Sequence, residues 1–348
     1  MNLLVTGGAG FIGSNAIHQL LDEPLIRKLV NLDCLTYAGH LISLAEVSGH
    51  PKYVFEQVDL RHAPAVNDVV RRHAITHVLH LAAESHVDRS ISGPGDFVQT
   101  NVVGTFNLLE ACRAEWGNDP AGRRFHHVST DEVYGSLGPS GSFTETTPYA
   151  PNSPYSASKA ASDWLVRSYH HTYGLPVVIT NCSNNYGPRQ FPEKLIPVVV
   201  QSLLARRPVP VYGDGLNVRD WLYVRDHVSA LWTVLTRGRT GETYNIGGHN
   251  ERTNLQLVHL LCDLVDELAP ALGGNSRRLI SFVPDRPGHD RRYAISIEKF
   301  RRELGWLPSE DLSSGLEKTV DWYLQNKAWS DAIADRRYDR TRLGLKGV

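Results

Sequence analysis

The sequence lacks the features of a membrane, secreted or nucleic-acid-binding protein. No apolar run approaches the length that spans a bilayer. The formal net charge of the 348 residues is -1, so there is no basic footprint for nucleic acid. The amino end leads directly into a strand pattern over residues 3–5, without a cleavable leader. We therefore expect a cytoplasmic protein with no membrane and no nucleic-acid partner.

Cysteine is also scarce, and metal-binding patterns are missing. The four cysteines are far apart and lack the spacing of zinc ligands. The 16 histidines include no HExxH or similar pair. We expect no metal site, and four free thiols in a reducing compartment. The cysteines are Cys34, Cys112, Cys182 and Cys262.

What the chain does contain is an alternation of strand and helix patterns in its first half. Short apolar runs that read as strands alternate with runs of helical periodicity. This order predicts an α/β protein with a Rossmann-like, doubly wound parallel sheet. The expected strands cover 3–6, 29–32, 53–58, 77–81, 125–129 and 177–180, and the expected helices cover 65–73, 96–112 and 156–173, with another from 14.

A glycine-rich turn links the first strand to the first helix. Gly7 allows the tight turn, Gly10 lets the backbone approach a pyrophosphate, and Gly13 lets helix and strand pack closely. The amino end of the helix then offers free N–H groups to the phosphates. Asp33, at the end of the second strand, is placed to accept hydrogen bonds from ribose hydroxyls and to repel a 2′-phosphate. Together these features predict NAD, rather than NADP, as the cofactor.

The character of the chain changes after residue 188, where prolines, isolated aromatics and charged turns become frequent. We predict an NAD-binding domain over 1–190, to which 224–249 return. A smaller, discontinuous α+β substrate domain is expected over 191–223 and 250–330. Residues 331–348 form a charged tail, and we expect the chain after Lys327 to be partly disordered.

The stretch from Arg124 to Lys159 concentrates the groups that can do chemistry. A strand pattern ends at Thr130, Asp131 and Glu132, and Tyr155 and Lys159 follow at the start of a helical pattern. Side chains four residues apart on a helix share one face. Ligands of open α/β sheets bind beyond the carboxyl ends of the strands. These five residues are therefore the candidate catalytic set.

These motifs resemble a known family. The glycine turn and the Tyr-x-x-x-Lys spacing resemble the extended short-chain dehydrogenase/reductase superfamily, and TDEVYG at 130–135 resembles its nucleotide-sugar 4,6-dehydratases, most closely those that act on dTDP-glucose. Runs at 80–91, 180–188, 191–197 and 285–295 extend the resemblance to nearly the whole chain except the tail. It implies removal of water from C5 and C6 of a nucleotide-bound glucose. Tightly bound NAD would take a hydride from C4 and return it to C6.

The resemblance also implies a role for each catalytic candidate. A free tyrosine has a pKa of roughly 10, too high for a base at neutral pH, and a neighbouring cation favours the phenolate. Tyr155 is thus the expected base at the C4 hydroxyl, with Lys159 tuning it and Thr130 hydrogen-bonding the C4 oxygen. Glu132 would take the C5 proton, and Asp131 would protonate the leaving C6 hydroxyl. Two close carboxyls can split their pKa values, which suits these two roles.

Binding residues follow from the strand ends and the resemblance together. The expected NAD-binding residues are Gly7, Gly10, Phe11, Ile12, Gly13, Asp33, Leu35, Thr36, Asp59, Leu60, Leu81, Ala82, Ala83, Thr100, Tyr155, Lys159 and Ser183. The expected dTDP-glucose-binding residues are Ser85, Thr130, Asn184, Glu193, Lys194, Leu195, Pro210, Tyr212, Arg219, Asn254, Arg286 and His289. The residues alone leave the nucleotide base open.

Two alternatives and one assembly prediction remain. A 4-epimerase or decarboxylase of the same superfamily would keep the glycine turn, Tyr155 and Lys159, but would not need the acid/base pair. A non-catalytic NAD-binding regulator on the same fold would have no reason to keep Tyr155 and Lys159 together with Asp131 and Glu132. Apolar residues outside the sheet-facing stripes of the helices at 96–112 and 156–173 predict a homodimer through a four-helix bundle, as in the family.

Overall fold

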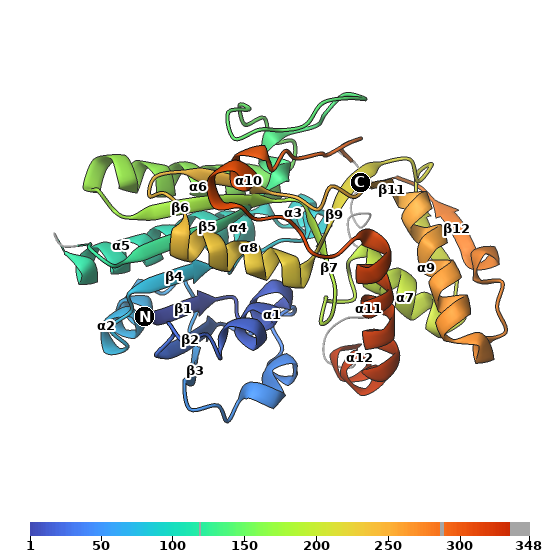
Figure 1. Cartoon of the computed structure of the whole chain (residues 1–348), viewed down its shortest axis with the longest axis horizontal. Coiled ribbons are helices and arrows are strands. Elements are labelled where there is room, and N and C mark those ends of the chain that lie inside the picture. The colour runs from blue at the N-terminus through green and yellow to red at the C-terminus, as the bar shows by residue number, and fades with distance from the viewer. Residues whose placement is uncertain (118–119, 286–288, 335–348) are drawn as a thin grey trace.

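The central element is a seven-stranded sheet in which every neighbouring pair is parallel (Figure 1). The structure is a computed structural model and describes residues 1–117, 120–285 and 289–334. In spatial order the strands are β10 (Thr243–Ile246), β6 (Val177–Cys182), β5 (Arg124–Thr130), β4 (His77–His80), β1 (Asn2–Thr6), β2 (Lys28–Asp33) and β3 (Tyr53–Gln57). The chain order reverses beside β1, so the predicted Rossmann-like α/β fold is confirmed.

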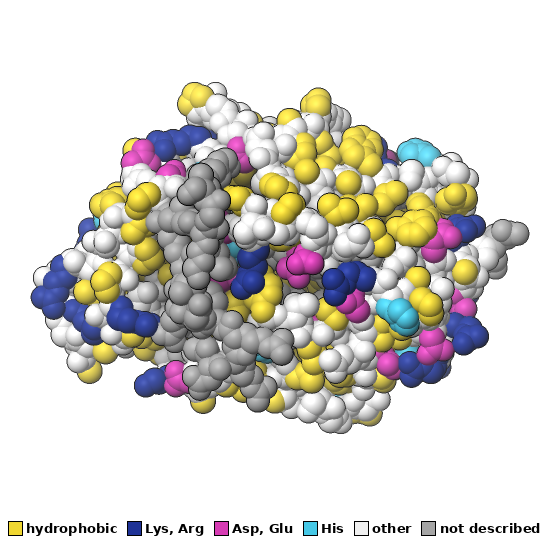
Figure 2. Space-filling model, turned by 180° about the vertical axis from the view of Figure 1, so that it is seen from behind, with side chains coloured by type: hydrophobic (Ala, Val, Ile, Leu, Met, Phe, Trp, Pro, Cys, Tyr) yellow, Lys and Arg dark blue, Asp and Glu magenta, His cyan; other side chains and the backbone are white. Residues whose placement is uncertain are grey.

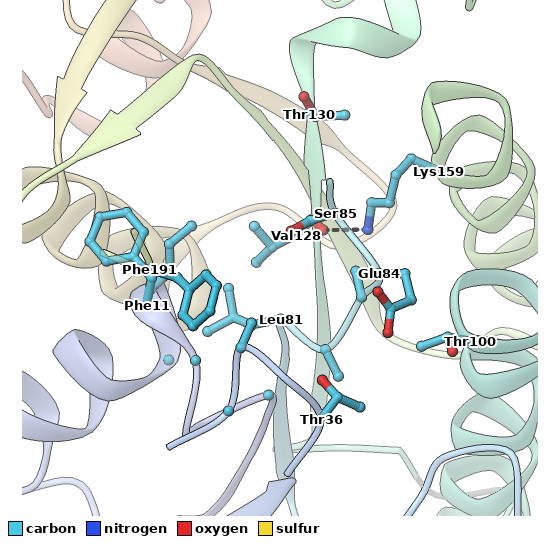
Figure 3. A pocket seen from close by; sticks show the side chains of 18 of the residues that line it. Phe11, Thr36, Leu81, Glu84, Ser85, Thr100, Val128, Thr130, Lys159 and Phe191 are labelled. Carbon is cyan, nitrogen blue, oxygen red and sulfur yellow. Dashed lines mark hydrogen bonds between the residues drawn. The ribbon is translucent and has the colours of Figure 1, made fainter. Parts of the chain in front are cut away.

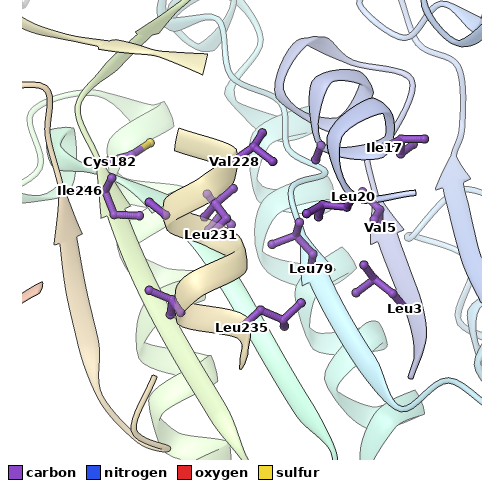
Figure 4. Close-up of a cluster of buried hydrophobic side chains, with 14 of the residues drawn as sticks. Leu3, Val5, Ile17, Leu20, Leu79, Cys182, Val228, Leu231, Leu235 and Ile246 are labelled. Carbon is purple, nitrogen blue, oxygen red and sulfur yellow. The ribbon is translucent and has the colours of Figure 1, made fainter. Parts of the chain in front are cut away.

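Helices cover both faces of this sheet. Helices α1 (Phe11–Leu20) and α8 (Val224–Arg237) pack on one face, and α2 (Ala63–Arg72), α5 (Thr105–Trp116) and α6 (Pro154–Tyr173) pack on the other. Successive strand residues point to opposite faces. Leu3 and Val5 therefore join the cluster under α1 and α8 (Figure 4), whereas Leu4 joins the cluster under α2, α5 and α6.

The second half of the chain builds a smaller lobe beside the carboxyl ends of the strands (Figure 1). Its helices α7 (Leu195–Leu204), α9 (Asn254–Leu268), α11 (Leu312–Gln325) and α12 (Lys327–Ala334) share one apolar cluster. Two small sheets complete it, one of β7 (Asn184–Tyr186), β9 (Val218–Tyr223) and β11 (Glu251–Thr253), the other of β8 (Val209–Tyr212) and β12 (Ile280–Val283).

The end of this lobe lies further along the chain than we expected. Trp329 and Ile333 are buried in the apolar cluster, so α12 occupies the first residues of the expected tail. Residues 335–348 lie outside the described part of the chain. Short elements connect the rest: α3 (Val87–Ser92), α10 (Glu298–Leu304) and the 3₁₀ turns at Leu41–Val47, Asp131–Tyr134, Pro270–Leu272 and Ser276–Leu279. No helix in the described ranges is both long and apolar enough to cross a membrane.

One expected helix has an irregular start. The pattern over 96–112 forms α4 (Pro94–Phe97), a π-helical segment (Val98–Gly104) and α5 in succession. The Asn101 amide group donates to the Glu84 carbonyl and to the Ser158 hydroxyl, and its oxygen accepts from the Glu84 N–H. These bonds tie the segment to the loop after β4 and to α6. π-Helical turns are frequent at functional sites, and Thr100 in this segment lines the cavity described next.

Candidate active site

A cavity of about 530 Å³ lies at the carboxyl ends of the parallel strands (Figure 3). This is the size of an ordinary small-molecule site. All five catalytic candidates line it, because β5 ends in Thr130 and the amino end of α6 faces that strand end. Most of the expected cofactor residues line it as well: Gly7, Gly10, Phe11, Ile12, Gly13, Asp33, Thr36, Asp59, Leu60, Leu81, Ala82, Ala83, Thr100 and Ser183.

The glycine turn leaves no room for side chains at two positions. Gly7 has φ +70°, and a Cβ there would lie 2.8 Å from the Ala82 Cα. A Cβ on Gly13 would lie 2.1 Å from the Gly7 carbonyl oxygen, so helix α1 can approach β1 only with glycine there. Helix α1 begins at Phe11 with no side-chain cap. Its first N–H groups therefore remain available at the cavity, which fits a dinucleotide pyrophosphate.

Asp33 anchors the loop that follows β2. One carboxylate oxygen accepts from the Ala9 N–H at 2.9 Å and the other from the Leu35 N–H at 2.8 Å. Burial raises the pKa of this carboxyl, while the two backbone N–H groups oppose the shift. Leu35 has φ +57° and packs against the core, so its side chain does not line the cavity. Asp33 does line it, where a ribose would lie next to the glycine turn.

The amino end of α6 is fixed by a capping box in which Ser153 and Ser156 each bond the other's backbone N–H. The Lys159 ammonium donates to the Val128 carbonyl at 2.9 Å, and Figure 3 shows it pointing from α6 to that strand. Burial lowers the pKa of Lys159 and raises that of Tyr155 well above its usual range. The negative charge of Glu132 also raises the pKa of Tyr155. These effects oppose deprotonation of Tyr155, and positive charge near its hydroxyl would favour it.

The two carboxylic acids stand directly after β5. The Thr130 hydroxyl accepts from the Glu132 N–H at 3.3 Å and donates to Asp131 at 3.4 Å, which holds the turn in place. Asp131 is 2% exposed. Burial raises its pKa well above the usual range, and the negative charges of Glu132 and Asp220 add to the effect. Asp131 is thus a carboxyl group that holds its proton more strongly than an exposed one, which suits it to act as a proton donor.

Five expected substrate residues meet at the other end of the cavity: Ser85, Thr130, Asn184, Glu193 and Lys194. The Lys194 ammonium donates to the Ser85 carbonyl at 3.0 Å. Glu193 accepts from the Tyr37 hydroxyl at 3.2 Å, and Arg89 lies 3.5 Å from the same carboxylate. The segment at 191–194 therefore joins the loop after β2 and helix α3 across the cavity.

The remaining substrate candidates in the described part of the chain do not line the cavity. The buried Arg219 guanidinium donates to the Val218 and Asp290 carbonyls and lies 4.3 Å from the centre of the Tyr293 ring. Its charge reaches the cavity, because it lowers the pKa of Asp131. Arg286 lies outside the described residues. The others belong to the second lobe: Leu195 starts α7, Pro210 and Tyr212 are in β8, Asn254 starts α9, and His289 pairs with Asp285 at 2.7 Å.

Several lining residues were not among the candidates. Most are sequence neighbours of predicted residues, so extending each strand end or loop by one or two positions would have found them. Gly39, Asp96 and Gln190 lie three or more positions from any candidate, so no such extension would have found them. The full set is Leu32, Cys34, Ala38, Gly39, Val58, Arg61, Glu84, Asp96, Val128, Ser129, Cys182, Asn185, Gln190 and Phe191.

The glycine turn on β1 and the Tyr155/Lys159 pair facing β5 define an extended short-chain dehydrogenase/reductase. Comparison with known proteins narrows this class. Residues 4–319 match the GDP-mannose 4,6 dehydratase family. The dTDP-glucose 4,6-dehydratase of Neisseria meningitidis serogroup B is 56% identical over 98% of both chains. The chain belongs to the dTDP-glucose 4,6-dehydratase family.

Solved structures agree with this assignment. The dTDP-glucose 4,6-dehydratase of Streptomyces venezuelae, crystallised with NAD and dTDP, is 47% identical, with a TM-score of 0.88 over 96% of this chain and 100% of that one. The UDP-glucose 4-epimerase of Thermus thermophilus, in complex with NAD, is 31% identical, with a TM-score of 0.83 over 94% and 100%. The fold is thus shared with epimerases, and the site must separate the two reactions.

Proposed function

We propose that the protein converts dTDP-glucose to dTDP-4-keto-6-deoxyglucose with NAD, in a route to deoxysugars. The observation that carries the proposal is the buried, proton-holding Asp131 beside Glu132, in one cavity with Tyr155 and Lys159. A 4-epimerase needs the last two groups but no acid for a leaving hydroxyl. The high identity to dehydratases supports the same choice.

The oxidation half uses Tyr155, Lys159 and Thr130. The NAD that fits the glycine turn and Asp33 supplies a hydride acceptor and a positively charged ring. Since burial and Glu132 hold the pKa of Tyr155 high, positive charge from Lys159 and from that ring would be needed for Tyr155 to lose its proton, and the phenolate then takes the C4 hydroxyl proton. Thr130, at the end of β5, orients the C4 oxygen. The Lys159 ammonium, fixed on the Val128 carbonyl, is positioned for the nicotinamide ribose.

The elimination half uses the two carboxyl groups. A ketone at C4 acidifies the C5 proton, which the Glu132 carboxylate removes. Asp131 gives its proton to the C6 hydroxyl, which leaves as water. Burial and the Glu132 charge favour the protonated form of Asp131, as the acid step requires.

The second lobe is proposed to hold the nucleotide. In this division, residues 1–190 with 224–249 bind NAD, and 191–223 with 250–330 bind the substrate. Arg219, His289 and Arg286 would contact the diphosphate, since two or more cations match its charge. Tyr212 and Pro210 would lie against the base, with Leu195 and Asn254 beside them. Glu193, Lys194, Asn184 and Ser85 would contact the sugar.

An isotope experiment tests this function. With deuterium at C4 of dTDP-glucose, the label should appear at C6 of the same sugar molecule, because one bound NAD carries the hydride. A mixture of labelled and unlabelled substrate should give no crossover products. Return of the label to C4 would indicate an epimerase, and no transfer would indicate a regulator. The turnover rates of UDP-glucose and GDP-glucose, measured in parallel, test our proposal that the enzyme prefers dTDP-glucose.

We also propose a cytoplasmic homodimer in which α5 and α6 of two chains form a four-helix bundle. Phe106, Trp164 and Tyr173 on these helices are 44%, 56% and 55% exposed. Figure 2 shows hydrophobic side chains gathered on the side of the molecule where α5 and α6 lie. A patch of this kind on a soluble fold marks an interaction surface.

The dimer is tested by size. Phe106→Glu with Trp164→Glu should yield a monomer in light scattering at micromolar concentration, since a two-fold contact buries each changed residue twice. The control is Leu307→Glu, at a position that is 56% exposed and lies outside these helices. A wild-type monomer at the same concentration would exclude the dimer.

A further inference from the structure

Helix α6 carries a third ionisable side chain in line with Tyr155 and Lys159. Asp163 follows Lys159 by four residues, so the three side chains form one stripe along the helix. The Asp163 side chain is 0% exposed. Burying an ionised carboxylate is costly unless an opposite charge and hydrogen bonds compensate it. The groups around Asp163 therefore indicate what compensates its charge and which role the carboxylate has.

Two hydroxyl groups hydrogen-bond the Asp163 carboxylate. The Ser129 hydroxyl donates to one oxygen at 2.8 Å, and the Tyr149 hydroxyl also hydrogen-bonds the group. The His127 Nε2 lies 3.1 Å from the other oxygen. Burial lowers the pKa of His127 well below its usual range, and the nearby Lys159 charge lowers it further. His127 is therefore a neutral neighbour and does not supply the compensating charge.

The compensating charge comes from Lys159. Its ammonium donates to the Val128 carbonyl, and the hydroxyl of the next strand residue, Ser129, donates to Asp163, so consecutive residues of β5 hold the two groups. Burial lowers the pKa of Lys159, and Asp163 is the first charge that opposes this. The other titratable groups that act on either partner are Arg167 on the same helix, His80 on β4, Cys182 on β6 and Tyr134 after β5. The last three are held neutral by burial.

We propose that Asp163 is a positioning residue whose carboxylate is the buried counter-charge that keeps Lys159 protonated and thereby lets Tyr155 act as a base at neutral pH. This inference rests on the proposed roles of Tyr155 and Lys159. Asp163 does not line the cavity, so it acts through Lys159 and touches neither substrate nor cofactor.

The arrangement predicts a specific pH dependence. Burial raises the pKa of Asp163 to about 6, against the opposing effect of Lys159. As the pH falls through about 6, Asp163 takes up a proton and Lys159 loses its counter-charge. The C4 oxidation step should weaken over this range. Asp163→Asn removes the negative charge, so the variant should behave at every pH as the wild type does below about pH 6.

The test compares Asp163→Asn with Asp321→Asn, an exposed position on α11. We expect C4 oxidation in Asp163→Asn to be at least about tenfold slower at mildly alkaline pH, since an opposite charge typically shifts a pKa by roughly 1–3 units. The ratio of wild type to variant should shrink as the pH falls through about 6. Asp321→Asn should match the wild type throughout.

A second measurement reads Lys159 directly, without turnover. Acetic anhydride modifies only neutral amines, and mass spectrometry of the NAD-loaded protein gives the labelling rate of Lys159 relative to the exposed Lys327. This ratio should rise at least about tenfold in Asp163→Asn. Ser129→Ala, which removes one donor to the carboxylate, should move the acid limb of C4 oxidation to higher pH. Ser129→Ala also tests the proposal if Asp163→Asn fails to fold.

The outcomes distinguish a failure of the Asp163 proposal from a failure of the proposed function. Unchanged labelling and an unchanged pH profile in Asp163→Asn would overturn the role of Asp163, even if activity fell uniformly. Wild-type protein that transfers no label from C4 to C6 would overturn the proposed function instead. In that case the labelling ratio would still decide whether Asp163 supports the charge of Lys159.

Discussion

Replacing Asp131 by asparagine should stop the reaction between its two halves. The substitution keeps the shape of the side chain but removes the acidic proton, which burial and the Glu132 charge help Asp131 to retain. A general acid typically contributes about a hundredfold to ten-thousandfold in rate, which corresponds to about 2.7–5.4 kcal/mol of transition-state stabilisation. Oxidation at C4 does not use this proton, so it should continue.

The assay is the absorbance of enzyme-bound NADH after mixing with one equivalent of dTDP-glucose. Wild-type enzyme should show little NADH, because the hydride returns to C6 in the same cycle. Asp131→Asn should accumulate NADH, and Asp131→Asn with Glu132→Gln should do so with no loss of water. Tyr155→Phe should form no NADH at all. The reasoning fails if Asp131→Asn releases the keto-deoxy sugar at the wild-type rate, or if Tyr155→Phe and the carboxyl variants stop at the same point.

Three further predictions follow from individual contacts. Asp220→Asn removes a charge that raises the pKa of Asp131, so the alkaline limb of the elimination step should move to lower pH, measured by product formation in rapid-quench experiments. Gly13→Ala would place a Cβ 2.1 Å from the Gly7 carbonyl oxygen. It should lower the free energy of unfolding by roughly 1–3 kcal/mol, and with it the melting temperature and the NAD content of the purified protein. Asp33→Ala removes the negative charge expected near the ribose, so the ratio of NAD to NADP affinity by calorimetry should fall; a wild type that prefers NADP would contradict the reading of this residue.

Local sequence patterns were sufficient for the fold class and for the centre of the site. The apolar runs predicted six of the seven sheet strands near their observed ends. Gly7 adopts a positive φ in the turn, and Gly13 is required by a contact within the same strand–turn–helix unit. The same holds for Tyr155 and Lys159, which share a face because helical geometry alone places them four residues apart. Such features depend on neighbours in the chain, so a sequence contains them.

Long-range packing decided the rest. No pattern predicted that Asn101 would bond Glu84 and Ser158, or that the expected helix at 96–112 would therefore begin with a π-helical segment. Asp163 and His127 belong to no motif that the sequence reveals, and the motif that contains Lys159 does not show which group balances its charge. The protonation of these three groups depends on complete burial and on charges from other strands and helices. Desolvation and electrostatic interaction act through space, so only the folded chain determines which of these groups carries a charge.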